Sequence, residues 1–242
     1  MKINAQQIID DTIAVFEKSG AADIVRRCEN VVRDEEYKRL HPFPLTATNI
    51  VIDCEQFKQD IEKYQASFEQ WGTDHLHLHR YGLALVNQDG IIKPNDPING
   101  SLMAWNRDNP TQPLIETDCT VPTSVMQMPS LEPLNVFEGH WCRSNILKWN
   151  TNAFFFPHID TIVPSMWIRL WASTSPDVTV RFFNEITGEL QVEEFEPGRV
   201  YIIDTSLVHD AVATGDNVYQ LFLSVLPSAV PVISAVTIPN SP

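Results

Sequence analysis

The second half of this sequence is a dense series of short apolar segments separated by turn residues, and this feature limits the possible folds most strongly. The segments lie at about 140–149, 153–160, 166–174, 178–184, 189–196, 199–204 and 217–226. Glycine-containing pairs such as Thr187-Gly188 and Pro197-Gly198 mark turns between them. Many short strands with regular turns predict a β-sandwich or a β-barrel.

The first half has a different pattern. Apolar residues at a period near 3.6 predict two helices before Pro42 and a third helix from Cys54 to Trp71. Residues 75–86 alternate with period two and predict a strand. Residues 93–133 are rich in Pro, Asn and Asp, which indicates long irregular connections with one short strand.

We therefore expect a single domain over residues 1–242 that is mainly β with N-terminal helices. Its parts are a helical region at 1–74, a strand with long loops at 75–133, and a jelly-roll core at 134–242.

Charge and composition exclude several classes of function. The net charge of −14 argues against a nucleic-acid or anionic-membrane partner, because both require a basic face. The four cysteines form no CxxC pair and are expected to be reduced thiols. No long apolar run predicts a membrane helix, and the amino terminus lacks the basic-then-apolar order of a signal peptide. We expect a cytoplasmic protein and leave its oligomeric state open.

Three residues carry the strongest chemical signal: His158, Asp160 and, after a later strand, His209. A histidine in a strand is ordinarily a surface or hydrogen-bonded residue. Here, however, each histidine follows an apolar segment, so polar side chains emerge where buried strands end. Positions i and i+2 of a strand share a face roughly 7 Å apart, so His158 and Asp160 can close on one ion. Two histidines and one carboxylate are typical of non-haem Fe(II) sites, whereas zinc usually selects a more closed set.

Residues 140–226 resemble the double-stranded β-helix core of Fe(II)/2-oxoglutarate-dependent oxygenases, and are most similar to the aspartyl/asparaginyl β-hydroxylase-like branch. The matching stretches are PHID at 157–160, IRLW at 168–171, FEPGRVYIIDTSLVHDA at 195–211 and GDNVYQLFL at 215–223.

The resemblance implies a jelly-roll, cupin-like fold and iron ligation by His158, Asp160 and His209. It also implies a dioxygenase that uses Fe(II), O2 and 2-oxoglutarate, most plausibly a hydroxylase of an amino-acid or peptidyl side chain. The substrate is then a small molecule or a peptide.

The family also holds the far carboxylate of 2-oxoglutarate with a basic residue, often about ten positions after the distal histidine. This chain has Val218-Tyr219-Gln220 there. A buried carboxylate needs a charged or multiply hydrogen-bonding partner. The candidate is Arg169, which alternates in phase with Trp167 and Trp171 and can make a two-pronged contact. Further candidates are Arg181, Lys148 and the Tyr219 hydroxyl.

Two other functions stay open at this point. The first is a cupin-like metal-dependent dioxygenase or isomerase that does not use 2-oxoglutarate, which the missing basic residue motivates. The second is a non-catalytic jelly-roll binding protein. Residue Asp210, beside the distal histidine, is expected to orient that histidine or its neighbours.

Overall fold

The structure is a computed structural model, and it describes residues 39–71, 79–151, 153–158, 167–184 and 189–239. The helices predicted before Pro42 lie outside these residues, apart from their last positions. The described strands are β1 (Leu45–Val51), β2 (Glu69–Gln70), β3 (Arg80–Asn87), β4 (Val121–Pro122), β5 (Trp141–Trp149), β6 (Phe154–His158), β7 (Ile168–Ser173), β8 (Val178–Asn184), β9 (Glu189–Val192), β10 (Arg199–Ile203), β11 (His209–Ala213) and β12 (Val218–Val225).

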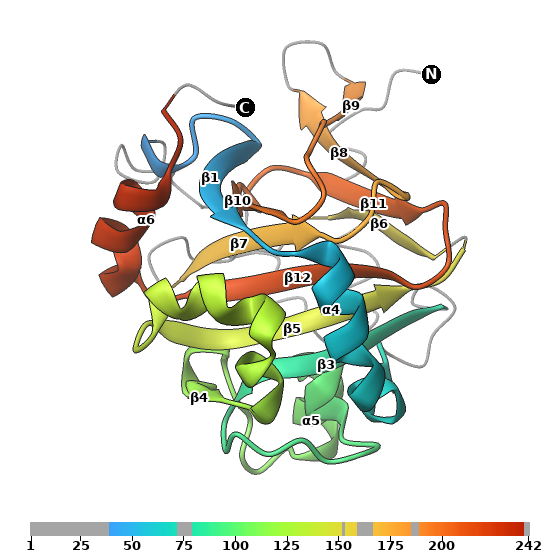
Figure 1. The fold of residues 1–242 in the computed structure, drawn as a ribbon. Helices are drawn as coiled ribbons and strands as arrows, with labels where there is room; N and C mark the ends of the chain where they lie inside the picture. The colour runs from blue at the N-terminus through green and yellow to red at the C-terminus, as the bar shows by residue number, and fades with distance from the viewer. Residues whose placement is uncertain (1–38, 72–78, 152, 159–166, 185–188, 240–242) are drawn as a thin grey trace.

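These strands form two antiparallel sheets. The larger has the order β1-β10-β7-β12-β5-β3-β2, with β4 paired to β3, and the smaller has the order β6-β11-β8-β9. From β5 to β12 the chain passes repeatedly between the two sheets, which is the winding of a jelly roll. The predicted double-stranded β-helix core is confirmed, and β1, β2 and β3 extend its larger sheet (Figure 1).

Helical segments connect the strands or cover them, and Figure 1 shows α4 in front of the larger sheet. They are the α-helices α4 (Cys54–Ile61), α5 (Leu102–Asp108) and α6 (Val230–Val236) and the 3-10 segments η1 (Glu62–Ser67), η2 (Pro97–Asn99), η3 (Glu116–Asp118), η4 (Ser124–Gln127), η5 (Pro129–Phe137) and η6 (Pro227–Ala229). Within the described residues, no helix is long and apolar enough to cross a membrane.

An apolar cluster lies on each face of the larger sheet. The outer cluster packs α4, η5 and α6 on one face through residues such as Phe57 and Ile146. The inner cluster lies between the two sheets and joins Trp149 and Trp171 to Phe182 of β8. Because side chains alternate along a strand, membership of one cluster or the other tells which residues point into the barrel.

The predicted helix from Cys54 to Trp71 is shorter in the structure. Asp53 caps α4 by accepting hydrogen bonds from the backbone of the first turn, and the α-helix ends at Ile61. A 3-10 segment follows, and then β2 pairs with β3, so the last residues of the predicted helix are extended. Tertiary pairing overrides the apolar periodicity there. The strands β1 and β11 and the helices α5 and α6 were not predicted, and α5 lies within residues 93–133, which were expected to be irregular.

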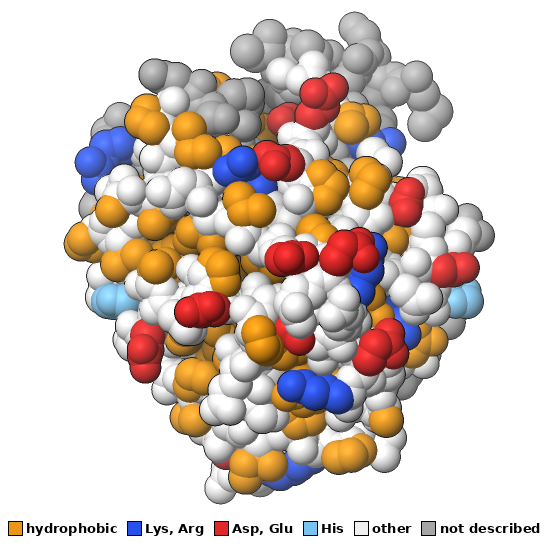
Figure 2. Space-filling model, in the orientation of Figure 1, with side chains coloured by type: hydrophobic (Ala, Val, Ile, Leu, Met, Phe, Trp, Pro, Cys, Tyr) orange, Lys and Arg blue, Asp and Glu red, His pale blue; other side chains and the backbone are white. Residues whose placement is uncertain are grey.

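Figure 2 shows one face of the molecule, on which acidic and basic side chains are interspersed among apolar ones. The basic side chains in this view form no continuous patch. This face therefore offers no basic surface, in keeping with the net charge of −14.

Gly198 occupies the tight turn before β10 and holds β1 against the sheet. Its φ is +85°, and an added Cβ would lie 2.4 Å from the Ile52 carbonyl oxygen. The Gly198 carbonyl accepts from Ile52 N at 2.8 Å, and its amide donates to the Ser173 carbonyl at 2.7 Å. The backbone approach therefore requires glycine.

We predict that Gly198→Ala lowers the free energy of unfolding by about 1–3 kcal/mol more than Gly139→Ala. The control is matched because Gly139 has a φ of +80° and nothing within 4 Å of an added Cβ. Both variants carry the same backbone strain, and only Gly198→Ala adds the clash. Chemical denaturation measures the difference, and equal losses in the two variants would contradict the account.

Candidate metal and ligand site

His158 and His209 are directly paired across two neighbouring strands. The strand β11 pairs antiparallel with β6, and His209 is the register partner of His158. Paired positions in an antiparallel ladder lie about 4.5–5.5 Å apart at Cα. The structure thus brings together two of the three expected metal ligands at the backbone level, although they are far apart in sequence.

The imidazole of His209 is buried between the sheets. It is 4% exposed and stacks on Phe182, with ring centroids 5.5 Å apart and an interplanar angle of 24°. Its Nδ1 lies 2.9 Å from the Leu207 carbonyl oxygen. In the tautomer that donates this hydrogen bond, Nε2 carries the lone pair. Metal-binding histidines are commonly held in this way by a carbonyl.

The position of His209 differs from the expectation in one respect. The sequence placed it just past a strand at 199–204, but β10 ends at Ile203 and His209 opens a separate strand in the other sheet. A short turn changes sheets between the two.

The third expected ligand, Asp160, lies outside the described residues, as does the side chain of His158. Within the described part of the chain, no three His, Cys, Asp or Glu side chains gather in a way that could hold a metal ion. The fit of iron therefore depends on the paired histidine positions, the buried imidazole and the donor types of the sequence.

Arg169 is the one residue among the four cosubstrate candidates that faces the barrel interior. It alternates with Ile168 and Leu170, which belong to the outer cluster, and shares its face with Trp171 of the inner cluster. Its Nη1 donates to the Ser224 hydroxyl on β12.

Lys148 and Tyr219 lie on the outer face instead. Tyr219 packs against Phe57 and Phe68 of the helical layer, with ring centroids 5.7 and 6.0 Å away. Gln65 joins the two residues: its amide donates to the Tyr219 hydroxyl and its carbonyl accepts from Lys148 Nζ, both at 2.8 Å. Burial raises the pKa of Tyr219. The structure does not bring these two residues to His209.

Arg181 faces away from the interior as well. It is the register partner of Asp210 and grips its carboxylate with two nitrogens, Nε at 2.9 Å from Oδ1 and Nη2 at Oδ2. Asp210 is fully buried, and its hydrogen bond raises the pKa of Arg181. Asp210 therefore ties β11 to β8 at the position directly after His209.

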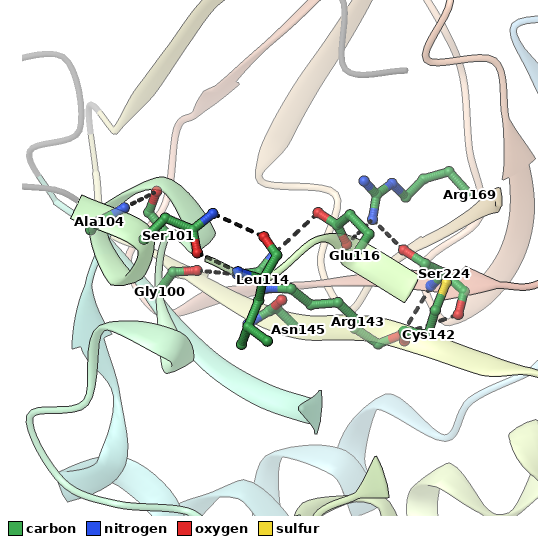
Figure 3. A network of polar contacts seen from close by, with 12 residues as sticks. Gly100, Ser101, Ala104, Leu114, Glu116, Cys142, Arg143, Asn145, Arg169 and Ser224 are labelled. Atoms are coloured by element: carbon green, nitrogen blue, oxygen red, sulfur yellow. Dashed lines mark hydrogen bonds and ion pairs between the residues drawn. The ribbon is translucent and has the colours of Figure 1, made fainter. Parts of the chain in front are cut away.

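A polar network that the sequence did not predict lies at the Arg169 end of the interior (Figure 3). Glu116 of η3 accepts from Arg143 Nη1 at 3.4 Å and lies 3.9 Å from Arg169 Nη1. Arg143 also donates to the Gly100 carbonyl at 2.5 Å. The residues 93–133 were predicted as connections and gave no charge signal, because Glu116 acquires its partners only in the folded chain.

Two further polar side chains of the interior have unpartnered atoms. Gln220 is fully buried on the inner face of β12, and neither of its amide atoms has a hydrogen-bond partner among the described residues. The same holds for the indole nitrogen of Trp149, which is 1% exposed. The guanidinium of Arg80 on β3 lies over Trp149 and Phe155, 5.3 and 3.8 Å from their ring centroids. Buried polar groups without partners are uncommon in folded proteins and often mark a place for a ligand or water.

The described cysteines show no sign of reactivity. Cys54, Cys119 and Cys142 are free thiols. Burial raises the pKa of Cys142 to about 12 and that of Cys119 to about 11, so both stay protonated.

Comparisons with known proteins give likenesses of fold only. No family model and no curated protein sequence matches this chain. Among solved structures, KdgF from Halomonas sp. has a TM-score of 0.26 and 17% identity over 34% of this chain and 66% of that one. A 2OG-Fe(II) oxygenase family oxidoreductase from Burkholderia pseudomallei has a TM-score of 0.34 and 10% identity over 60% and 65%. A prolyl-4-hydroxylase from Pseudomonas putida has a TM-score of 0.42 and 12% identity over 78% and 95%.

This chain spans less than two thirds of the length of KdgF and 46% of the length of an oxalate oxidase that also matches. At these identities and TM-scores the likenesses carry no argument for the activity, which has to come from the site.

We predict that Tyr219→Phe lowers the free energy of unfolding by about 1 kcal/mol, because it removes the hydrogen bond from Gln65. Gln65→Leu should remove the same bond, so the two losses should not add. The wild-type advantage over Tyr219→Phe is full below the ordinary tyrosine pKa of 10.0. It is lost as pH rises through the raised pKa of the folded protein. Denaturation of the wild type, the two single variants and the double variant at neutral and alkaline pH measures this, and strictly additive losses would contradict it.

Proposed function

We propose that this chain is a non-haem Fe(II)- and 2-oxoglutarate-dependent oxygenase that hydroxylates an amino-acid or peptidyl side chain. The observation that carries the proposal is the register pairing of His158 with His209 on β6 and β11 of a jelly roll. The His158-Ile159-Asp160 spacing adds a carboxylate two positions after the first histidine.

His158, Asp160 and His209 would hold the iron. Two imidazoles and one carboxylate leave coordination positions open, and bound Fe(II) supplies the activation of O2 that hydroxylation needs. The chain's own contribution begins with His209, whose Nδ1 contact with the Leu207 carbonyl and stacking on Phe182 fix the ring. An imidazole fixed before binding loses little entropy when it takes a metal.

The inner cluster, from which Phe182 stacks on His209, is buried. Phe182, Trp171 and Trp149 of the inner cluster are each at most 2% exposed. A dry, shaped site strengthens electrostatic interactions and protects reactive species from side reactions.

Arg169 is our candidate for the second carboxylate of 2-oxoglutarate. It lies on the inner face, its side chain is 10% exposed, and its Nε has no hydrogen-bond partner among the described residues. A guanidinium can hold a carboxylate by two parallel hydrogen bonds. The contacts of Lys148, Tyr219 and Arg181 give those three residues structural roles in our proposal.

One observation favours the alternative of a cupin-like metal enzyme that does not use 2-oxoglutarate. On the strand where the resembling family places a basic residue, this chain buries the neutral amide of Gln220. A neutral group with both donor and acceptor atoms suits an uncharged polar ligand as well as a carboxylate.

The first test is an anaerobic titration of the protein with Fe(II) and 2-oxoglutarate, followed by an assay for succinate in air. We expect a weak visible charge-transfer band and succinate formation. His158→Ala, Asp160→Ala and His209→Ala should each lower iron affinity by more than about 100-fold, because even outer-shell changes cost 10–100-fold. His140→Ala is the control, since His140 lies at the surface beside Ser228. No band and no succinate, with His209→Ala indistinguishable from wild type, would sink the proposal.

A second prediction tests the assignment of Arg169. Arg169→Met should raise the Kd for 2-oxoglutarate by at least about 30-fold and leave iron binding unchanged, because a buried charge loses its partner. Lys148→Met removes a positive charge from the other face of the same sheet and should leave this Kd within about twofold. If 2-oxoglutarate binding survives Arg169→Met, the assignment of Arg169 is wrong.

A further inference from the structure

Arg143 and Glu116 have no part in the function proposed above, yet Glu116 lies between Arg143 and Arg169 at one end of the interior. Glu116 comes from η3 in the long connection between β3 and β5, and Arg143 comes from β5. Figure 3 shows the Glu116 carboxylate between the two guanidinium groups.

The contacts make this a single cluster. Glu116 Oε1 accepts from Arg143 Nη1 at 3.4 Å, and Glu116 Oε2 lies 3.9 Å from Arg169 Nη1. The side chains of Arg143, Arg169 and Glu116 are 6%, 10% and 16% exposed. All three charges are therefore largely buried. In such a site a charge interacts with its neighbours more strongly than it does in water.

Among the described residues, the cluster is short of one negative charge. Two guanidinium groups face one carboxylate there, so the formal charges sum to +1. Arg143 Nε, Arg169 Nε and Glu116 Oε2 have no hydrogen-bond partner among the described residues. Figure 3 also shows the second terminal nitrogen of Arg169 directed away from both Ser224 and Glu116. Burying an uncompensated charge is costly, so this arrangement favours a bound anion.

We infer that Arg143, Glu116 and Arg169 form one carboxylate-binding site in which Glu116 competes with the ligand for Arg169. This inference rests on the proposed function, in which the ligand is 2-oxoglutarate. It adds that Glu116 sets the affinity for that ligand. Glu116 repels the incoming carboxylate, and Arg143 limits this repulsion by holding Glu116 Oε1.

The charge count also determines the ligand class. One carboxylate brings the site to neutrality, whereas a doubly charged phosphate would leave a buried negative charge. The site should therefore take carboxylates in preference to phosphate esters of similar size.

The test measures the Kd for 2-oxoglutarate in the anaerobic Fe(II)-loaded protein. Glu116→Gln keeps an oxygen for Arg143 and removes the negative charge, so binding should tighten by about tenfold. Arg143→Gln leaves Glu116 to Arg169 alone and should weaken binding by about tenfold. The double variant should return to within about threefold of wild type. Glu116→Ala is a second variant with the same expected sign as Glu116→Gln.

The matched control is Glu196→Gln, which removes a carboxylate beside Arg199 at the surface. It should leave the Kd unchanged. If Glu116→Gln or Glu116→Ala weakens binding while thermal stability is unchanged, Glu116 merely supports Arg169 and the inference is overturned.

A metal-free titration with glutarate separates this inference from the proposed function. We expect glutarate to bind Glu116→Gln more tightly than wild type and to bind Arg169→Met least. Glutarate binding of this pattern, in a protein that gives no iron-dependent band, would reject the oxygenase and keep the site. Equal binding by Glu116→Gln and Arg169→Met would overturn the site.

Discussion

The antiparallel pairing of β6 with β11 is the contact on which the candidate site depends. It places His158 opposite His209 and so makes one local site from two stretches that are distant in sequence. The pairing is supported from the other side, where β11 also pairs with β8 and the buried Asp210 holds Arg181. A strand fixed on both edges and by a charge-assisted pair cannot shift its register without losing all of these contacts.

The two faces of the larger sheet differ in their polar side chains. The outer face is covered by helices and carries the structural tie between Gln65, Lys148 and Tyr219. The inner face mixes aromatic residues with Arg169 and Gln220, and both have buried atoms without hydrogen-bond partners among the described residues, which is costly. Polar groups retained at such a cost are the chain's clearest structural sign of a ligand. The charges of Glu116 and Arg143 beside Arg169 are the basis of our proposal that this ligand carries a carboxylate.

The sequence predicted the β-rich core well, because apolar alternation and Gly- or Pro-containing turns report directly on strands. It missed β1 and β11, since polar residues such as Thr46, Thr48 and Asp210 interrupt their apolar pattern, and these residues are buried only through tertiary partners. Among the site residues, types and spacing indicated His158 and His209. The sequence could not indicate which face of the sheet Lys148 and Tyr219 occupy. A two-residue period shows which residues share a face, but not which face the helices cover.

The central claim is that His158 and His209 bind one iron ion together. X-ray absorption spectroscopy of the anaerobic Fe(II)-loaded protein tests it most directly, because imidazole rings give a distinct multiple-scattering signal that can be counted. The account predicts two imidazoles on the iron in the wild type and one in His209→Ala. A wild-type spectrum with one imidazole or none would contradict it.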